Sequence, residues 1–265
     1  MRLRFAKLRA LAFGMACALL LAGTASAAEV RVMISGGLTA AYKVLVPEFE
    51  RSTGHKVLTA YGPSMGTTAN AIPIRLERGE GADVLIMVGY ALDDLVKQGK
   101  VVADSRVDLV KSPIGVAVRS GAPKPDVSSA DALKRTLLSA KSIAYSDSAS
   151  GVYVSTEMFQ RLGIAEEMKD KARKIPAEPV AGVVARGDAE IGFQQISELL
   201  PVPGVDIVGP LPSELQKITV FSAGIAAVSK EPDAGKALIK FLTSPAASTA
   251  IVKSGMEPIP ASTTN

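Results

Sequence analysis

The stretch V-R-V-M-I-S-G-G-L-T-A-A-Y, residues 30 to 42, passes from an apolar strand into a helix through Ser35-Gly36-Gly37. Its first five residues form the short apolar run of a buried strand. Apolar residues then recur at helical spacing from Leu38 until Gly54 ends the pattern. Pro47 lies inside this pattern and predicts a kink or an early end of the helix. A strand that enters a helix through small residues is the repeating unit of an α/β protein.

The rest of the chain repeats this alternation, which predicts an α/β fold throughout. Strands are expected at residues 30–34, 56–60, 82–88, 114–119, 141–145, 190–194 and 218–228, and helices at 38–53, 64–78, 90–98, 131–138, 151–162, 179–186, 233–242 and 246–253. The strands at 114–119 and 218–228 lack separate partners within one domain, so we interpret them as crossings between two lobes. Lobe I is then expected to hold residues 28–112 and 222–265, and lobe II residues 113–221. A single doubly wound domain is the alternative.

Residues 1–27 predict a cleaved secretory signal, with basic residues first, an apolar run from Leu11 to Leu21 and Ala25-Ser26-Ala27 before Ala28. A retained anchor is the alternative, but the run is shorter than the roughly 20 residues that span a membrane. We therefore expect export to the periplasm. The signal carries four of the 30 basic residues and none of the 26 acidic ones, so the remainder is balanced in charge. A balanced chain without tryptophan argues against a nucleic-acid partner.

Residues for metal or covalent chemistry are scarce. The single cysteine, Cys17, lies in the expected signal, and the single histidine, His55, follows a helix-ending glycine in an expected loop. Acidic residues do not cluster at ligand spacing, so we expect no metal site and no cofactor. Neither G-x-S-x-G nor a phosphate-binding loop with lysine is present, so hydrolase and NTPase functions lack their minimum parts.

Three expected joins from strand to helix are rich in small residues, at 35–37, 62–66 and 146–151. At each, the free N–H groups of a first helical turn and nearby hydroxyls favour an anion. The glycines in these joins would let a ligand approach the backbone closely. One such join is usually an ordinary helix cap, but three at the carboxyl ends of strands predict an anion pocket.

Five motifs together resemble one family. They are S-G-G-L-T-A-A at 35–41, E-F-E-R-S-T-G-H-K-V at 48–57, R-G-E-G-A-D-V-L-I at 78–86, S-G-V-Y at 150–153 and A-E-I-G-F at 189–193. Their order and spacing are similar to those of the periplasmic molybdate-binding proteins of ABC importers, over nearly the whole mature chain. The resemblance implies the type II periplasmic binding-protein fold, in which two α/β lobes joined by two crossing strands close on an anion. It also implies a small anionic ligand and an ABC permease as partners, and we expect a monomer.

By this resemblance, the anion is held at four places, of which Ser64 and Ser150 match two and a position near Val180 matches a third. The residues expected to bind the ligand are Ser35, Gly36, Gly37, Ser64, Met65, Gly66, Ser150, Gly151, Tyr153, Val180, Gln195 and Arg119. Two positions depart from the family, since Gly37 replaces a serine and Gln195 replaces a common tyrosine. These changes open room, and an amide suits a carboxylic acid better than a bare oxyanion.

We therefore expect a di- or tricarboxylate, with molybdate, tungstate or sulfate as alternatives. Arg119 and Arg75 are candidates for pairing with carboxylates. Two functions fit the resemblance: a solute-binding protein of an ABC importer, which we place first, and an aconitate isomerase. Such an isomerase interconverts trans- and cis-aconitate by an allylic proton shift, and Tyr153, Tyr61 or a pocket carboxylate would have to move the proton.

Overall fold

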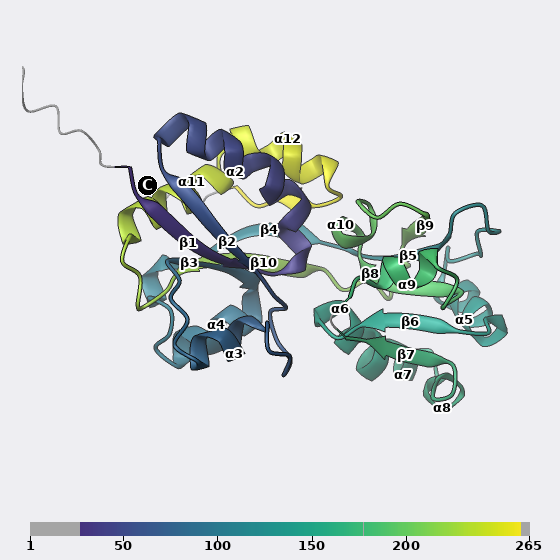
Figure 1. Ribbon diagram of the computed structural model, residues 1–265. Coiled ribbons are helices and arrows are strands. Elements are labelled where there is room, and N and C mark those ends of the chain that lie inside the picture. Colours follow the sequence, from purple (N-terminus) through teal and green to yellow (C-terminus); the bar gives the residue numbers. More distant parts are fainter. Residues whose placement is uncertain (1–26, 177, 261–265) are drawn as a thin grey trace, which may run out of the picture.

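The computed structural model describes residues 27–176 and 178–260, which form two α/β lobes side by side (Figure 1). Apart from Ala27, the predicted signal lies outside the described residues. Within the described part of the chain, no helix has the length and apolar character needed to cross a membrane.

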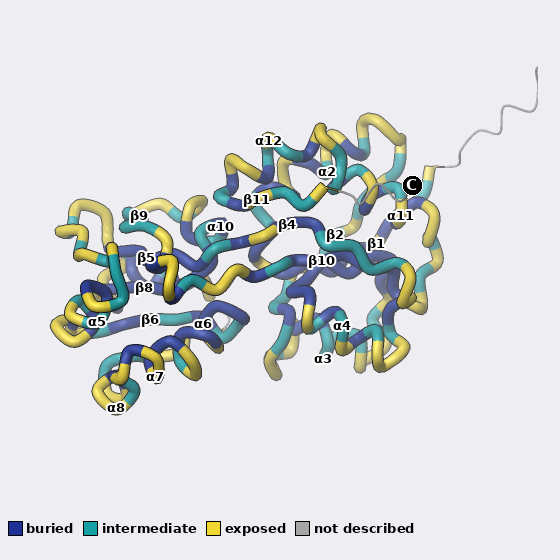
Figure 2. Tube along the Cα trace, turned by 180° about the vertical axis from the view of Figure 1, so that it is seen from behind, coloured by how far each residue is buried: buried dark blue, intermediate teal, exposed yellow. Residues whose placement is uncertain are grey.

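The first lobe is built on a sheet of six strands. In spatial order they are β11 (Glu257–Pro258), β4 (Val107–Ser112), β10 (Thr219–Ile225), β3 (Val84–Val88), β1 (Glu29–Ile34) and β2 (Lys56–Tyr61). β1 runs parallel to β2 and β3, whereas β10 is antiparallel to β3 and β4. Both ends of the chain therefore contribute to one sheet, and Figure 2 shows its central strands as buried.

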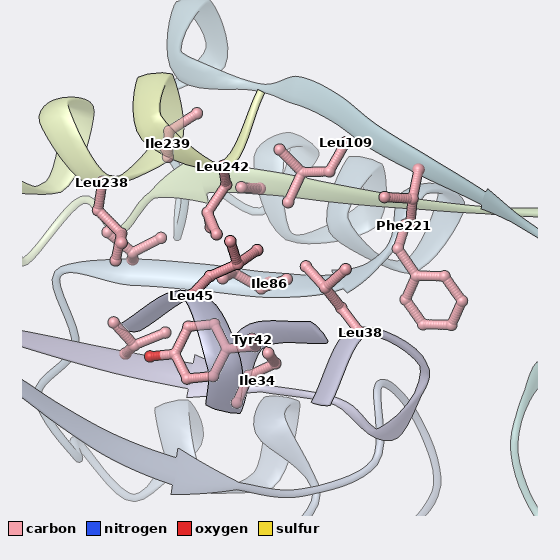
Figure 3. Packing of buried hydrophobic residues seen from close by; sticks show 14 of the residues in the cluster. Ile34, Leu38, Tyr42, Leu45, Ile86, Leu109, Phe221, Leu238, Ile239 and Leu242 are labelled. Carbon is pink, nitrogen blue, oxygen red and sulfur yellow. The ribbon is translucent and has the colours of Figure 1, made fainter. Parts of the chain in front are cut away.

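Helices cover both faces of this sheet. One face carries the 3₁₀ turn η1 (Gly36–Leu38), α2 (Thr39–Thr53), α11 (Pro232–Leu242) and α12 (Pro245–Lys253). The other face carries α3 (Ile72–Glu77) and α4 (Gly89–Lys97). A second 3₁₀ turn, η2 (Ala103–Ser105), precedes β4. Under α2, the buried side chains of Leu38, Tyr42 and Leu45 pack on Ile34 (Figure 3). The helical spacing that starts at Leu38 thus buries one face of α2 on the sheet, and Gly54 ends the helix with a φ of 76°.

The second lobe repeats this plan with five strands, in the order β7 (Ala172–Ile175), β6 (Ile143–Ser146), β8 (Ile191–Gln195), β5 (Ile114–Arg119) and β9 (Val205–Pro210). β6 is parallel to β7 and β8, and β5 is antiparallel to β8 and β9. Its helical segments are α5 (Ala130–Ser139), α6 (Ala149–Tyr153), the π-helical turn η3 (Val154–Met158), α7 (Phe159–Arg161), α8 (Ala165–Met168), α9 (Val180–Ala185) and α10 (Ile196–Leu199).

The chain crosses between the lobes twice, from β4 to β5 through Pro113 and from β9 to β10 through residues 211–218. The second crossing differs from the expected boundary at residue 221. Thr219 to Phe221 already pair with β4, so they belong to the first sheet.

The structure shows how Pro47 and Pro73 affect the two helices in which they were expected. Helix α2 does not end early at Pro47, because the missing N–H frees only the carbonyl group of exposed Lys43, which water reaches. The helix expected at 64–78 is shorter, since α3 covers only Ile72–Glu77. Pro73 lies in its first turn, where proline needs no hydrogen-bond acceptor, and residues 64–71 form a loop.

Candidate functional site

One cleft of about 460 Å³ is lined by residues of both lobes. The first lobe contributes the end of β1 with η1, the loop after β2 and the end of β3. The second lobe contributes the end of β6, the segment before α9 and the junction of β8 with α10. Figure 1 shows α6 and α10 on the side of the second lobe that faces the first. The carboxyl ends of the parallel strands therefore meet at this cleft, as they do in other open α/β sheets.

Two serine hydroxyls line the cleft from the first lobe. Ser64 is buried, and its Oγ accepts a hydrogen bond of 2.9 Å from the backbone N–H of Val88, which leaves its own hydrogen for another acceptor. Ser35 is also buried, and among the described residues its Oγ has no hydrogen-bond partner. A buried hydroxyl without a partner is costly, so Ser35 is suited to a ligand that completes its bonds.

The short helix α10 of the second lobe lies against η1 of the first. Ser197 lines the cleft from α10, is buried, and has no hydrogen-bond partner for its Oγ within the part of the chain described. Glu198 follows it, and a methyl group placed on Gly36 would overlap Oε1 of this glutamate. Gly36 therefore leaves the space that the Glu198 carboxyl group occupies. These contacts bring the hydroxyl groups of Ser35 and Ser197 and one carboxyl group to the same cleft.

Burial raises the pKa of Glu198 to about 7, and the negative charge of Asp147 adds to this effect, while hydrogen bonding by Gln194 opposes it. A carboxyl group is more easily buried neutral than charged, which is the physical reason for the shift. Near neutral pH, Glu198 is therefore present in both the protonated and the ionised form. A group with this property can accept a proton and return it.

The second glycine of the first join also makes room for a side chain of the protein. A methyl group on Gly37 would overlap the ring of Phe221, which comes from β10 and lines the cleft. Figure 3 shows Phe221 beside Leu38 at the end of the core cluster. These glycines were expected to leave space for a larger ligand, but side chains of the protein, Glu198 and Phe221, occupy the space beside them.

The third predicted join places two serines at the cleft and one behind its surface. Ser146 and Ser148 line the cleft, whereas Ser150 is fully buried and its Oγ lies 2.9 Å from that of Ser146. The N–H of Gly151 donates to the same Ser146 Oγ over 3.2 Å. Tyr153 does not line the cleft, because its hydroxyl donates to the carbonyl oxygen of Leu215 inside the second lobe.

Gln195 lines the cleft, but its amide bonds the crossing strands. In the orientation that satisfies both ends of the amide, Nε2 donates to the carbonyl oxygen of Ser112 over 3.1 Å and Oε1 accepts from Thr219 Oγ1 over 2.8 Å. Its neighbour Gln194 also lines the cleft and accepts a bond of 3.0 Å from the N–H of Val180. Val180 itself is buried under the cleft surface.

Of the remaining predicted residues, Tyr61 lines the cleft, whereas Arg119, Arg75, Met65 and Gly66 do not. Arg119 lies at the end of β5 that points away from the first lobe, and Arg75 pairs with Glu80. Met65 accepts a weak bond from Tyr90, and Gly66 lies in the neighbouring loop with a φ of 98°.

The basic residue that does line the cleft among the described residues is Lys43, on α2, with its Nζ 5.4 Å from the ring centre of Tyr61. Sequence reasoning missed Lys43, Ser197 and Glu198. Ser197 and Glu198 lie in a fourth junction of strand and helix, Q-Q-I-S-E-L at 194–199. This junction has no glycine to mark it. Across the described ranges, no group of three or more His, Cys, Asp or Glu residues is arranged to hold a metal ion.

Comparison with known proteins identifies the family of this chain. The sequence profile of bacterial extracellular solute-binding proteins matches residues 30–257. An aconitate isomerase from a Pseudomonas species is 51% identical over 97% of this chain and 99% of its own length. The molybdate-binding protein ModA of Azotobacter vinelandii is 30% identical over 88% of this chain and 91% of its own. The solved periplasmic molybdate-binding protein of the same organism aligns with a TM-score of 0.66, at 19% identity, and covers 88% of this chain and 100% of that one. The type II binding-protein fold is thereby confirmed.

Proposed function

The chain belongs to the bacterial extracellular solute-binding protein family, and within it we propose that this protein is a periplasmic isomerase that interconverts trans- and cis-aconitate. The observation that carries the proposal is the full-length relationship to an aconitate isomerase, which is much stronger than that to the molybdate-binding proteins. This reverses the order in which the sequence alone places the two functions. We also propose that residues 1–27 are removed on export.

The chemistry of the cleft supports a carboxylate substrate. The hydroxyls of Ser35, Ser64 and Ser197 supply neutral donors, and Lys43 supplies one positive charge at the cleft. A tricarboxylate presents several acceptors that such donors can bind. Moving a proton beside a carboxylate needs one group that titrates near neutral pH, and Glu198 has this property.

The experiment is proton NMR of the protein without residues 1–27, mixed with pure trans-aconitate in the presence of a chelator. Growth of the vinyl signal of cis-aconitate to a constant ratio is the expected result, and starting from cis-aconitate must give the same ratio. A heat-denatured sample is the control. If the spectrum stays unchanged over hours at micromolar protein concentrations, the isomerase proposal is wrong.

A solute-binding protein of an ABC importer is the second candidate, favoured by the relationship to the molybdate-binding proteins and by the unpartnered hydroxyls at the cleft. In this case an anion would raise the melting temperature and be released unchanged. Thermal shifts measured with molybdate, sulfate, citrate and both aconitates separate the two candidates, because a carrier binds its best ligand tightly and converts none. A permease would then be the partner of a monomeric protein.

A further inference from the structure

We propose that Glu198 is the catalytic residue that carries the proton in the isomerisation, an inference that rests on the proposed function. Glu198 lines the cleft from α10 and reaches the backbone of Gly36 in the opposite lobe. A substrate in this cleft therefore contacts a carboxyl group that is already placed between the two lobes.

The flanking residues suggest how the substrate is oriented. Ser35 and Ser197 are buried, line the same cleft and have Oγ atoms with no partner among the described residues. One hydroxyl comes from each lobe, next to Gly36 and to Glu198 respectively. A carboxylate bound by these hydroxyls would present its neighbouring carbon to Glu198. Such positioning lowers the barrier because the reacting groups are held together.

The other titratable groups at the cleft are less suited to this role. The charged residues lining it, besides Glu198, are Lys43, Asp147 and Glu178 among the described residues. Glu178 pairs with Arg186 at 3.0 Å, and Lys43 is suited to bind a carboxylate. Tyr61 also lines the cleft, but burial raises the pKa of its phenol, which makes it a weaker acid. Asp147 also lines the cleft, and its negative charge contributes to the raised pKa of Glu198.

The reaction is balanced with one proton carrier. The Glu198 carboxylate removes a proton from the methylene carbon of trans-aconitate, and the C–H electron pair becomes the new double bond. The pair of the old double bond moves onto the far carbon and its carboxylate. The Glu198 carboxylic acid then returns the proton to that carbon, which becomes the methylene group, and Glu198 is a carboxylate again. No atom or electron is gained or lost, and the hydroxyls that bind the substrate's carboxylates stabilise the negative charge of the intermediate.

The experiment compares kcat and substrate affinity in the wild type, E198Q and the matched control E166Q, which changes an exposed glutamate on α8 that pairs with Lys169. E198Q is expected to lower kcat by about 10²- to 10⁴-fold, the usual effect of removing a general acid–base. Its affinity for trans-aconitate, measured by calorimetry, should stay within about threefold, because the amide keeps the shape of the carboxyl group. E166Q should keep kcat within about tenfold, because Glu166 lies outside the cleft. Equal losses in the two variants, or an E198Q rate within tenfold of the wild type, would overturn the assignment.

A second variant separates chemistry from folding. E198D keeps the carboxyl group but withdraws it by one methylene, so it should recover part of the E198Q loss and shift the acid limb of the pH profile of kcat. A profile with the same limb in E198D and wild type would count against Glu198 as the titrating group. A wild type that does not isomerise aconitate at all would refute the proposed function instead, so the two failures are distinguishable.

Discussion

Replacing Glu198 by glutamine should change how the stability of the ligand-free protein depends on pH. In the wild type, burial raises the pKa of Glu198 from 4.5 to about 7. The folded state therefore holds a proton that the unfolded chain has already lost, and the free energy of unfolding declines as the pH rises from about 4.5 to 7. A shift of one pKa unit corresponds to about 1.4 kcal/mol, so the free energy of unfolding falls by about 3 kcal/mol over this pH range. Glutamine is neutral at every pH, so the variant does not lose this stability as the pH rises.

The assay is urea unfolding followed by circular dichroism between pH 4 and pH 8, because the chain has no tryptophan to report by fluorescence. At pH 4 the unfolding free energies of E198Q and wild type should agree, and at pH 8 the variant should be more stable by about 3 kcal/mol. Titrating groups that do not interact with Glu198 cancel in this difference. The charged groups that share the cleft, Lys43, Asp147 and Glu178, are present in both proteins. A difference that is constant with pH would refute the raised pKa of the Glu198 carboxyl group in the folded state.

Ser35→Ala should weaken binding of trans-aconitate by about 1 to 3 kcal/mol in calorimetry, because it removes a buried donor, and unchanged affinity would exclude Ser35 from the site. Gly37→Ala should lower the unfolding free energy by about 1 to 3 kcal/mol through overlap with the Phe221 ring, and adding Phe221→Leu should recover part of it. Burial alone would raise the pKa of Asp83, but hydrogen bonds from the N–H groups of Arg31, Lys230 and Glu231 and from the Ser229 hydroxyl lower it overall. Asp83→Asn should therefore destabilise the protein at neutral pH by about 1 to 3 kcal/mol, and the difference in urea unfolding should fade in acid.

The strands with strong apolar runs were predictable from the sequence. β5 has the predicted bounds, and β1 differs by one residue. β4, β7 and β9 were missed. β7 has only four residues, two of them basic, and β4 and β9 each carry an aspartate near the start, so their neighbours in the sheet make them strands. The helix expected at 64–78 was wrong in its first half, where local spacing suggested a helix that Pro73 limits to one short segment.

The site was predictable where it depends on local chain geometry. Ser64 and the segment 35–37 line the cleft, as the pattern of small residues after strands suggests. What fills the space beside Gly36 and Gly37 could not be read from the sequence, because Glu198 and Phe221 are brought there by a different helix and strand. Tyr153 was placed with the ligand by resemblance, yet its hydroxyl bonds a carbonyl oxygen that is distant in the sequence.

Helix α10 begins directly at the crossing strands. The N–H of Ile196 donates to the carbonyl oxygen of Pro113 over 3.0 Å, and the Gln195 amide bonds both crossings. When one lobe rotates about these strands, each residue sweeps an arc in proportion to its distance from the pivot. Glu198 lies three residues after Gln195, which is bonded to the crossing strands, so it would move through a shorter arc than the far rim of the cleft. If the lobes open about these strands, Glu198 therefore moves less relative to Gly36 than the far rim of the cleft does.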